Sequence, residues 1–272
     1  MSKYKSICLE ITNKCNYLCD HCYLSCGPFR NDIMSKSVID ESLKKLGSKA
    51  EQVIISGGEP TLFLETIEYV TNCCKIYSSE NGYPKEICLR TNGVWAQTKD
   101  KAIESLKKFY NIGITNLELT CYDKFHFELN NSVNLLDIKL LTNELNIFNN
   151  VKISYNSILN AKKLGRAKML NTLPYNNQCY IKKDMYNINV HGDIKVCKIG
   201  HTCYLGSILD KNIEEILNYD FIDILIHEGI NKLIDVFMVK FNKKISFDEF
   251  DDICEICHYV TSEWKRNIDE RR

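Results

Sequence analysis

Short apolar runs of strand type alternate with stretches in which apolar residues recur at helical spacing. The expected strands are Lys5–Thr12, Gln52–Ser56, Glu86–Thr91, Thr115–Cys121 and Val151–Ser157, and the expected helices are Ser35–Leu46, Leu62–Ser79, Lys99–Tyr110 and Leu135–Phe148. This alternation predicts parallel strands joined by right-handed helical crossovers, and therefore an α/β fold. Periodicity alone leaves open whether the sheet forms a closed barrel, a partial barrel or an open sheet.

The pattern changes after about Asn171. Tyr186–Val190 and Ile194–Cys197 flank His191-Gly192-Asp193, which predicts a β-hairpin whose glycine supplies the turn's positive φ. Helical patterns then run over Asn212–His227 and Ile230–Phe241. We therefore expect two domains, covering residues 1–171 and 172–272.

Charge and composition narrow the range of partners. Lys+Arg and Asp+Glu each number 35, so the net charge is zero and we expect no nucleic-acid or membrane partner. The most apolar long stretch, Ile222–Phe241, is interrupted by charged residues and is better explained as core helix than as a membrane span. The chain has 14 cysteines and starts without a signal-peptide pattern. A reducing, cytoplasmic location with thiols that serve metal clusters is expected.

Three of these cysteines lie in one short loop after the first expected strand. Cys15, Cys19 and Cys22 have C-x3-C-x2-C spacing. Three thiolates can ligate three irons of a [4Fe–4S] cluster, which leaves the fourth iron open to a substrate or cofactor. A structural zinc site usually has four protein ligands. The loop therefore favours a reactive cluster over a structural metal.

This loop resembles the C-x3-C-x-Φ-C signature of radical S-adenosylmethionine (SAM) enzymes, with His21 at the aromatic position Φ. Four later segments also resemble landmarks of that family and occur in the family's order. They are Gly57-Gly58-Glu59-Pro60, Leu89–Gly93, Asp123–His126 and Lys163–Ala167. The resemblance covers roughly the first 170 residues and implies a partial (β/α)6 TIM-like barrel.

The resemblance also implies a chemistry. SAM would chelate the open iron, and reduction of the cluster would cleave SAM to a 5′-deoxyadenosyl radical that abstracts a hydrogen atom from the substrate. The residues expected to bind the cofactor are His21, Tyr23, Gly57, Gly58, Glu59, Pro60, Asn92, Ser154 and Arg166. Turn or capping roles for Asn92 and Ser154, and a surface position for Arg166, are the alternatives.

A second set of cysteines lies in the C-terminal part. Cys179, Gly192 and Cys197 form C-x12-G-x4-C, which resembles the opening of the SPASM and twitch auxiliary-cluster domains. With Cys254 and Cys257 they match the shorter twitch type, which implies a second [4Fe–4S] cluster. A four-thiolate zinc site is the alternative. Cys203 could replace one ligand or remain a free thiol.

The leading hypothesis for function is a radical SAM enzyme that cross-links or epimerises a ribosomally made peptide. The alternatives are a twitch-type dehydrogenase of a small alcohol or aminocyclitol-like metabolite, and a non-catalytic zinc-binding protein. An epimerase needs a thiol that returns a hydrogen atom, and Cys121 and Cys203 are the candidates for this role. The expected partners are a short peptide or small-molecule substrate and an electron donor such as flavodoxin or ferredoxin.

Overall fold

One eight-stranded sheet forms the centre of the computed structural model, which describes residues 3–120, 135–154, 166, 185–197, 203–210, 213–217, 219–250 and 252–269. The strands are β1 (Tyr4–Glu10), β2 (Ala50–Ser56), β3 (Glu86–Thr91), β4 (Asn116–Leu119), β5 (Asn150–Ile153), β6 (Met185–Ile188), β7 (Asp193–Lys195) and β8 (Tyr204–Ser207). Their order in the sheet is β5-β4-β3-β2-β1-β6-β7-β8.

The first six strands are all parallel. β1 pairs with β2 on one side and with β6 on the other, and β3, β4 and β5 extend the sheet in chain order. Within the described residues β5 and β8 are edge strands, so the sheet does not close on itself. This arrangement confirms the expected α/β fold with an incomplete barrel of six parallel strands.

The helices follow the strands as the periodicity predicted, with small differences at their ends. They are α1 (Lys36–Lys45), α2 (Leu64–Asn81), α3 (Lys99–Ile112), α5 (Leu135–Leu145), α6 (Ile213–Leu217), α7 (Asp220–His227), α8 (Gly229–Phe241) and α9 (Ile253–Asp269). Ser35 caps the start of α1 through its side chain, and Gly113 ends α3 in a left-handed conformation.

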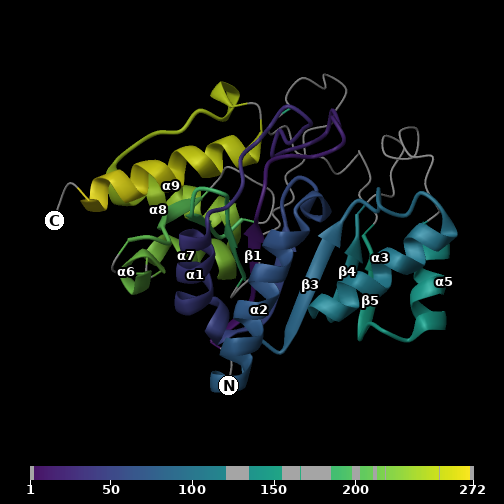
Figure 1. Ribbon diagram of the computed structural model, residues 1–272. Helices are drawn as coiled ribbons and strands as arrows, with labels where there is room; N and C mark the ends of the chain where they lie inside the picture. Colours follow the sequence, from purple (N-terminus) through teal and green to yellow (C-terminus); the bar gives the residue numbers. More distant parts are fainter. Residues whose placement is uncertain are drawn as a thin grey trace.

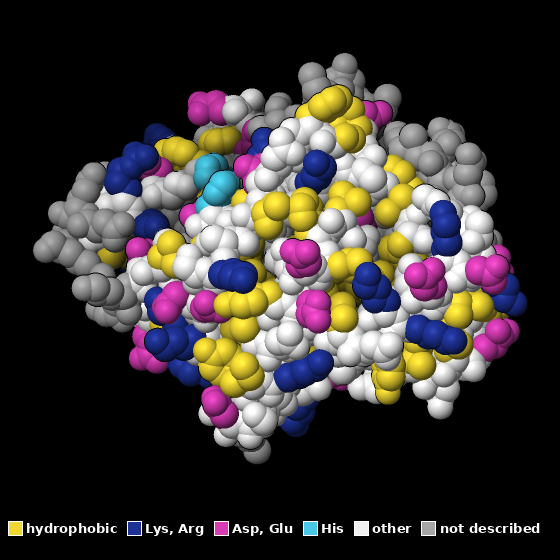
Figure 2. Space-filling view, viewed as in Figure 1, with side chains coloured by type: hydrophobic (Ala, Val, Ile, Leu, Met, Phe, Trp, Pro, Cys, Tyr) yellow, Lys and Arg dark blue, Asp and Glu magenta, His cyan; other side chains and the backbone are white. Residues whose placement is uncertain are grey.

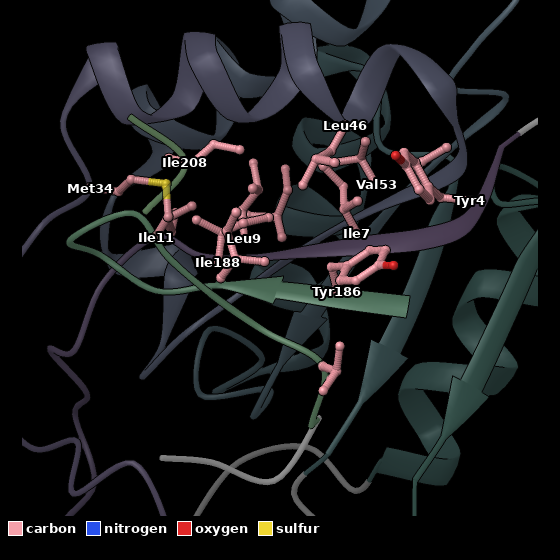
Figure 3. Packing of buried hydrophobic residues seen from close by; sticks show 14 of the residues in the cluster. Tyr4, Ile7, Leu9, Ile11, Met34, Leu46, Val53, Tyr186, Ile188 and Ile208 are labelled. Carbon is pink, nitrogen blue, oxygen red and sulfur yellow. The ribbon is translucent and has the colours of Figure 1, made fainter. Parts of the chain in front are cut away.

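The outer face of the sheet and the helices share one large apolar core. Alternate residues of β1, namely Ile7 and Leu9, point into this layer together with Ile188 of β6 (Figure 3). Side chains of α1, α2, α3, α5, α7, α8 and α9 complete the cluster. The intervening strand residues face the opposite side, where Cys8, Ile54 and Cys88 form a small cluster of their own. Helices thus cover the outer face of the sheet, and its inner face has a different lining (Figure 1).

The C-terminal segment continues the same sheet. β6 and β7 form the expected hairpin, with Gly192 at φ +90° in its turn. Because β6 also pairs with β1, the sheet extends across the expected boundary after residue 171, and the division into two domains stays a prediction.

The visible surface carries no extended patch of one charge, because Lys and Arg side chains alternate with Asp and Glu (Figure 2). No helix in the described ranges is both long and apolar enough to cross a bilayer.

Candidate active site

The candidate site lies where the parallel strands end. The segment that follows β1, residues 11–34, is called the cysteine loop here, and it arches over the carboxyl ends of the strands (Figure 1). Its two ends are joined because the Met34 amide donates to the Ile11 carbonyl at 2.8 Å. Inside the loop, the Cys15 amide donates to the Gly27 carbonyl at 3.1 Å. The loop is therefore a closed, internally hydrogen-bonded unit.

All three cysteines of the expected cluster site are in this loop and none forms a disulfide. Cys15 and Cys19 are buried, and Cys22 is half-buried. Arg166, distant in sequence, is bound to the same loop, because its amide donates to the Cys22 carbonyl at 3.1 Å and its Nε donates to the Cys19 carbonyl at 3.0 Å. The structure thus holds Arg166 against the backbone of the cysteine loop, and its expected contact with the cofactor stays a prediction.

A fourth thiol, Cys26, also belongs to the loop. The chain turns back at Ser25, which has φ +53°, and Cys26 donates a side-chain hydrogen bond to Cys22. This bond lowers the pKa of Cys22 to about 6, whereas burial raises the pKa of Cys15 to about 11. Cys26 was not singled out from the sequence. Its position four residues after Cys22 was the only signal of its place beside the other thiols.

The Gly57-Gly58 pair makes the close approach that its sequence suggested, but its neighbour is the cysteine loop itself. The amide of Gly58 donates to the Thr12 carbonyl at 2.7 Å, and the amide of Glu59 donates to the Lys14 carbonyl at 2.8 Å. A Cβ atom on Gly58 would overlap the carbonyl oxygen of Lys14. These glycines therefore allow two loop backbones to pair next to the cysteines.

Glu59 is fully buried beneath this junction. One carboxylate oxygen, Oε1, accepts from the hydroxyls of Thr61 and Thr91 at 2.5 and 2.7 Å, and Oε2 accepts from the Asn92 amide at 2.8 Å. Burial raises the pKa of this carboxyl group. Glu59 links the ends of β2 and β3, and its expected contact with the cofactor stays a prediction.

Asn92 connects this junction to the first cysteine. Its side-chain nitrogen donates to Asn16 Oδ1 at 2.9 Å and lies 3.8 Å from Cys15 Sγ, while its own oxygen accepts from the Val94 amide. Asn16 itself was not singled out from the sequence, although it directly follows Cys15. Asn92 therefore orients the start of the cysteine loop, and its expected contact with SAM stays a prediction.

Two buried donors beside the cysteines suit an anionic ligand. Asn16 Nδ2 and Arg166 Nη2 have no hydrogen-bond partner in the described part of the chain. A cluster with three thiolate ligands and the carboxylate of SAM both offer acceptors with negative charge. No three acidic, Cys or His side chains among the described residues converge as they would on a single metal ion. A cubane cluster is larger than one ion and holds its thiolates further apart, so the thiol set and the two donors fit a cluster with bound SAM.

The inner face of the sheet below the loop carries charged residues. Arg90 of β3 binds Glu118 of β4 through Nε and Nη2, at 2.9 and 2.8 Å from the same oxygen, Oε2. The other oxygen of Glu118 accepts from the hydroxyl of Ser154 at 2.6 Å. On the other side of β1, Lys195 Nζ lies 2.9 Å from Glu10 Oε2. None of these charged residues was singled out from the sequence.

Other residues expected at the cofactor lie around the same loop. Pro60 is buried and opens a short 3₁₀ turn, η2 (Pro60–Leu62), and His21 is half-buried. Burial raises the pKa of Tyr23, and the charges of Glu10 and Arg90 act on its hydroxyl group. Tyr23 therefore borders the charged inner face. Its expected contact with the cofactor stays a prediction.

The second cysteine set is only partly described. Cys197 is buried after β7, and its carbonyl accepts from Asn187 Nδ2 at 3.1 Å. Cys254 and Cys257 lie three residues apart on the first turn of α9 and therefore on one side of that helix. The fourth expected ligand, Cys179, lies outside the described residues. The auxiliary site stays a prediction.

Of the two candidate hydrogen-atom donors, only Cys203 lies in the part of the chain that the structure describes. Cys203 is fully buried, has φ +64°, and belongs to the large apolar core. This environment is that of a packing residue. Cys121 and the Asp123–His126 segment lie outside the described residues, so these assignments stay predictions.

Comparisons with known proteins point to one family. A family model with the description "Radical SAM superfamily" matches residues 9–130. Over 124 residues the chain is 29% identical to the "Putative peptide biosynthesis protein YydG" of Bacillus subtilis (strain 168), a match that spans 45% of this chain and 37% of that protein. It is 26% identical to the uncharacterized protein MJ0907 of Methanocaldococcus jannaschii over 76% of this chain and 90% of that protein.

Solved structures share the fold. BtrN in complex with AdoMet and 2-DOIA matches with a TM-score of 0.53 at 20% identity, over 85% of this chain and 91% of BtrN. Native anSMEcpe with bound AdoMet and Cp18Cys peptide matches with a TM-score of 0.54 at 14% identity, over 79% of this chain and 80% of that chain. At these identities the likeness concerns the fold alone, and it agrees with the incomplete barrel described above.

Proposed function

We propose that this chain is a radical SAM enzyme, which cleaves SAM reductively and modifies a short, ribosomally made peptide; the match of the family model to residues 9–130 supports this. The observation that carries the proposal is the cysteine loop with its three thiols, hydrogen-bonded to the Gly57-Gly58-Glu59-Pro60 segment at the carboxyl ends of the strands. The family implies one [4Fe–4S] cluster and SAM as cofactors.

Cys15, Cys19 and Cys22 would hold the cluster, and Asn16 and Arg166 would donate to its anionic surroundings. When bound, the reduced cluster and SAM supply a carbon radical that can remove a hydrogen atom from an unactivated C–H bond. The protein's own residues hold the loop in place. Gly58 and Glu59 fix it by backbone hydrogen bonds to Thr12 and Lys14. A small donor such as flavodoxin or ferredoxin would provide the electron.

A peptide substrate is supported by the relatives. The similar Bacillus protein is called a putative peptide biosynthesis protein, and anSMEcpe binds a Cp18Cys peptide. The second candidate is a dehydrogenase of a small alcohol or aminocyclitol-like metabolite. The support for this candidate is the similar fold of BtrN, whose structure contains 2-DOIA. Both reactions start from the same 5′-deoxyadenosyl radical and differ in the fate of the substrate radical.

The proposal is tested by expressing this chain in cells together with each short peptide encoded next to its gene. Growth in deuterated water, followed by mass spectrometry of the peptide, distinguishes the outcomes. We expect one peptide to be modified, with loss of two hydrogens for a cross-link or gain of solvent deuterium at an inverted α-carbon. Conversion of a small alcohol to a ketone by the purified enzyme, with every peptide unchanged, would instead support the dehydrogenase.

For the C-terminal segment we propose an auxiliary [4Fe–4S] cluster bound by Cys179, Cys197, Cys254 and Cys257. We expect Cys197→Ala and Cys254→Ala to lose about four irons per chain while reductive SAM cleavage persists, because the first cluster performs that step. Iron, zinc and sulfide analysis of the reconstituted protein measures this. If wild type instead binds only about four irons together with zinc, the second cysteine set is a structural zinc site.

A further inference from the structure

The inner face of the sheet carries an unusual set of buried charges. It consists of two ion pairs from four strands, called the charged quartet here: Glu10, Arg90, Glu118 and Lys195. Strand alternation places all four on the face opposite the helices, because their neighbours Leu89, Leu117 and Ile194 belong to the apolar core. The interior of an αβ barrel is normally filled by branched apolar side chains.

Fold stability does not explain the quartet. A buried ion pair offsets its desolvation cost only with excellent geometry, and apolar side chains of similar volume often stabilise a fold equally well or better. Glu10 and Arg90 lie near the carboxyl ends of β1 and β3, and the cysteine loop directly follows β1. Because the proposed radical forms at that loop, a substrate must approach it across this face.

The two ion pairs differ in the solvent exposure of their side chains. The Lys195 and Glu10 side chains are 1% and 6% exposed, whereas those of Arg90 and Glu118 are 14% and 9% exposed. The sealed pair joins β7 to β1 across β6 and so holds the strand that precedes Cys197 against the strand that precedes Cys15. The second pair is the more open of the two.

Arg90 has a donor that can be released to a ligand. Its Nε and Nη2 are engaged by a carboxylate oxygen of Glu118, but Nη1 donates to Cys8 Sγ at 3.8 Å. Sulfur is a weak acceptor. A carbonyl oxygen of a substrate would therefore be a better partner for Nη1 and would leave the pair with Glu118 intact.

The charge balance of the quartet favours one substrate chemistry. Two acids and two bases give a net charge of zero, so the face offers donors and acceptors without an excess of either sign. A peptide group is also neutral and carries one donor and one acceptor. A cationic aminocyclitol would gain most from an excess of carboxylates, which the quartet does not provide.

We propose that Arg90, fixed by Glu118, binds a main-chain carbonyl oxygen of a peptide substrate and so orients the peptide under the cysteine loop. This inference rests on the proposed function and deepens it, since it selects a peptide and names the residue that recognises its backbone. Glu118 acts through Arg90 and is a positioning residue.

The test uses blocked tetra-alanine (acetylated and amidated) as a peptide without functional side chains, and myo-inositol as a neutral polyol. Binding to the anaerobic, cluster-reconstituted protein with SAM is measured by saturation-transfer NMR. We expect the peptide to bind and Arg90→Gln to weaken it roughly tenfold or more, because a charged hydrogen bond is lost. Arg90→Lys should restore little, since an ammonium cannot hold Glu118 and a carbonyl with the same fork geometry.

Two further variants keep the result interpretable. Arg90→Gln combined with Glu118→Gln removes the pair without leaving a buried carboxylate alone, and it should lose peptide binding like the single variant. Arg266→Gln removes an exposed arginine that pairs with Glu263 on α9, and it should bind the peptide like wild type.

Three results would overturn the inference: peptide affinity of the double variant equal to wild type, binding of myo-inositol but not of the peptide, or no peptide binding by wild type. Peptide-free formation of 5′-deoxyadenosine is measured in parallel. If wild type forms no 5′-deoxyadenosine but binds the peptide in an Arg90-dependent way, the proposed reaction is contradicted. The inference that Arg90 binds the peptide would still hold.

Discussion

Replacing Cys15, Cys19 and Cys22 together by alanine is expected to remove one whole cluster, about four irons per chain, and to reduce SAM cleavage to background. The three thiols are the proposed cluster ligands, and backbone hydrogen bonds from Gly58 and Glu59 hold the cysteine loop in position. Without the thiolates no iron is retained there. Iron and sulfide analysis of the anaerobically reconstituted variant, together with its absorption spectrum, measures the loss.

Cys73→Ala is the matched control, because Cys73 is a half-buried free cysteine on α2. It should keep the iron content and the SAM cleavage of wild type. Full iron content in the triple variant would mean that the cluster is held elsewhere in the chain, and the assignment of the cysteine loop would be wrong.

Gly58→Ala is expected to have the second large effect. The added methyl group would overlap the carbonyl oxygen of Lys14, and this oxygen is a backbone atom that cannot move independently of the loop. Overpacking typically costs about 1–3 kcal/mol in the free energy of unfolding, and we expect the upper end of this range here because the neighbouring backbone cannot yield. We expect a lower midpoint of denaturant unfolding and poor cluster assembly in the same variant.

Gly82→Ala separates this clash from the general effect of replacing a glycine. Gly82 ends α2 at φ +74° and has open space around its Cβ position. Its replacement should cost only about 1–2 kcal/mol, because an L-residue is strained in a left-handed conformation. Equal destabilisation by the two substitutions would contradict the close pairing of Gly58 with the cysteine loop.

The sequence predicted the outer layer of this fold well. Expected and observed bounds are the same for β3, and the helices α1 and α3 differ from expectation only near their ends. These elements have clear periodicity and recognisable end signals, such as Ser35 before α1. Such signals are local, so a single sequence contains them in full.

The C-terminal elements were harder to predict. β8 and α9 were not expected, and the role of β6 as a sixth parallel strand was missed. β8 has only four residues, and β6 was identified only as half of a hairpin. Pairing of β6 with β1 joins segments that are distant in sequence, and no local pattern encodes such a contact.

The candidate site shows the same division. The motif residues Cys15, Gly58 and Asn92 could be found from spacing and resemblance. Their hydrogen-bond partners could not: Glu59 was expected at the cofactor, and no local pattern predicted that it accepts from Thr61, Thr91 and Asn92. The pairing of Arg90 with Glu118 depends on the register of β3 and β4, which cannot be predicted from local sequence patterns.

The central claim is that this chain cleaves SAM reductively at the cysteine loop. The most direct measurement is chromatographic quantification of 5′-deoxyadenosine and methionine after wild-type protein, reconstituted under argon, is incubated with SAM and dithionite. We predict that both products form in equal amounts, that their formation requires the reductant, and that the triple cysteine variant forms neither. A fully reconstituted wild-type protein that binds iron and sulfide at the cysteine loop but leaves SAM intact under these conditions would contradict the claim.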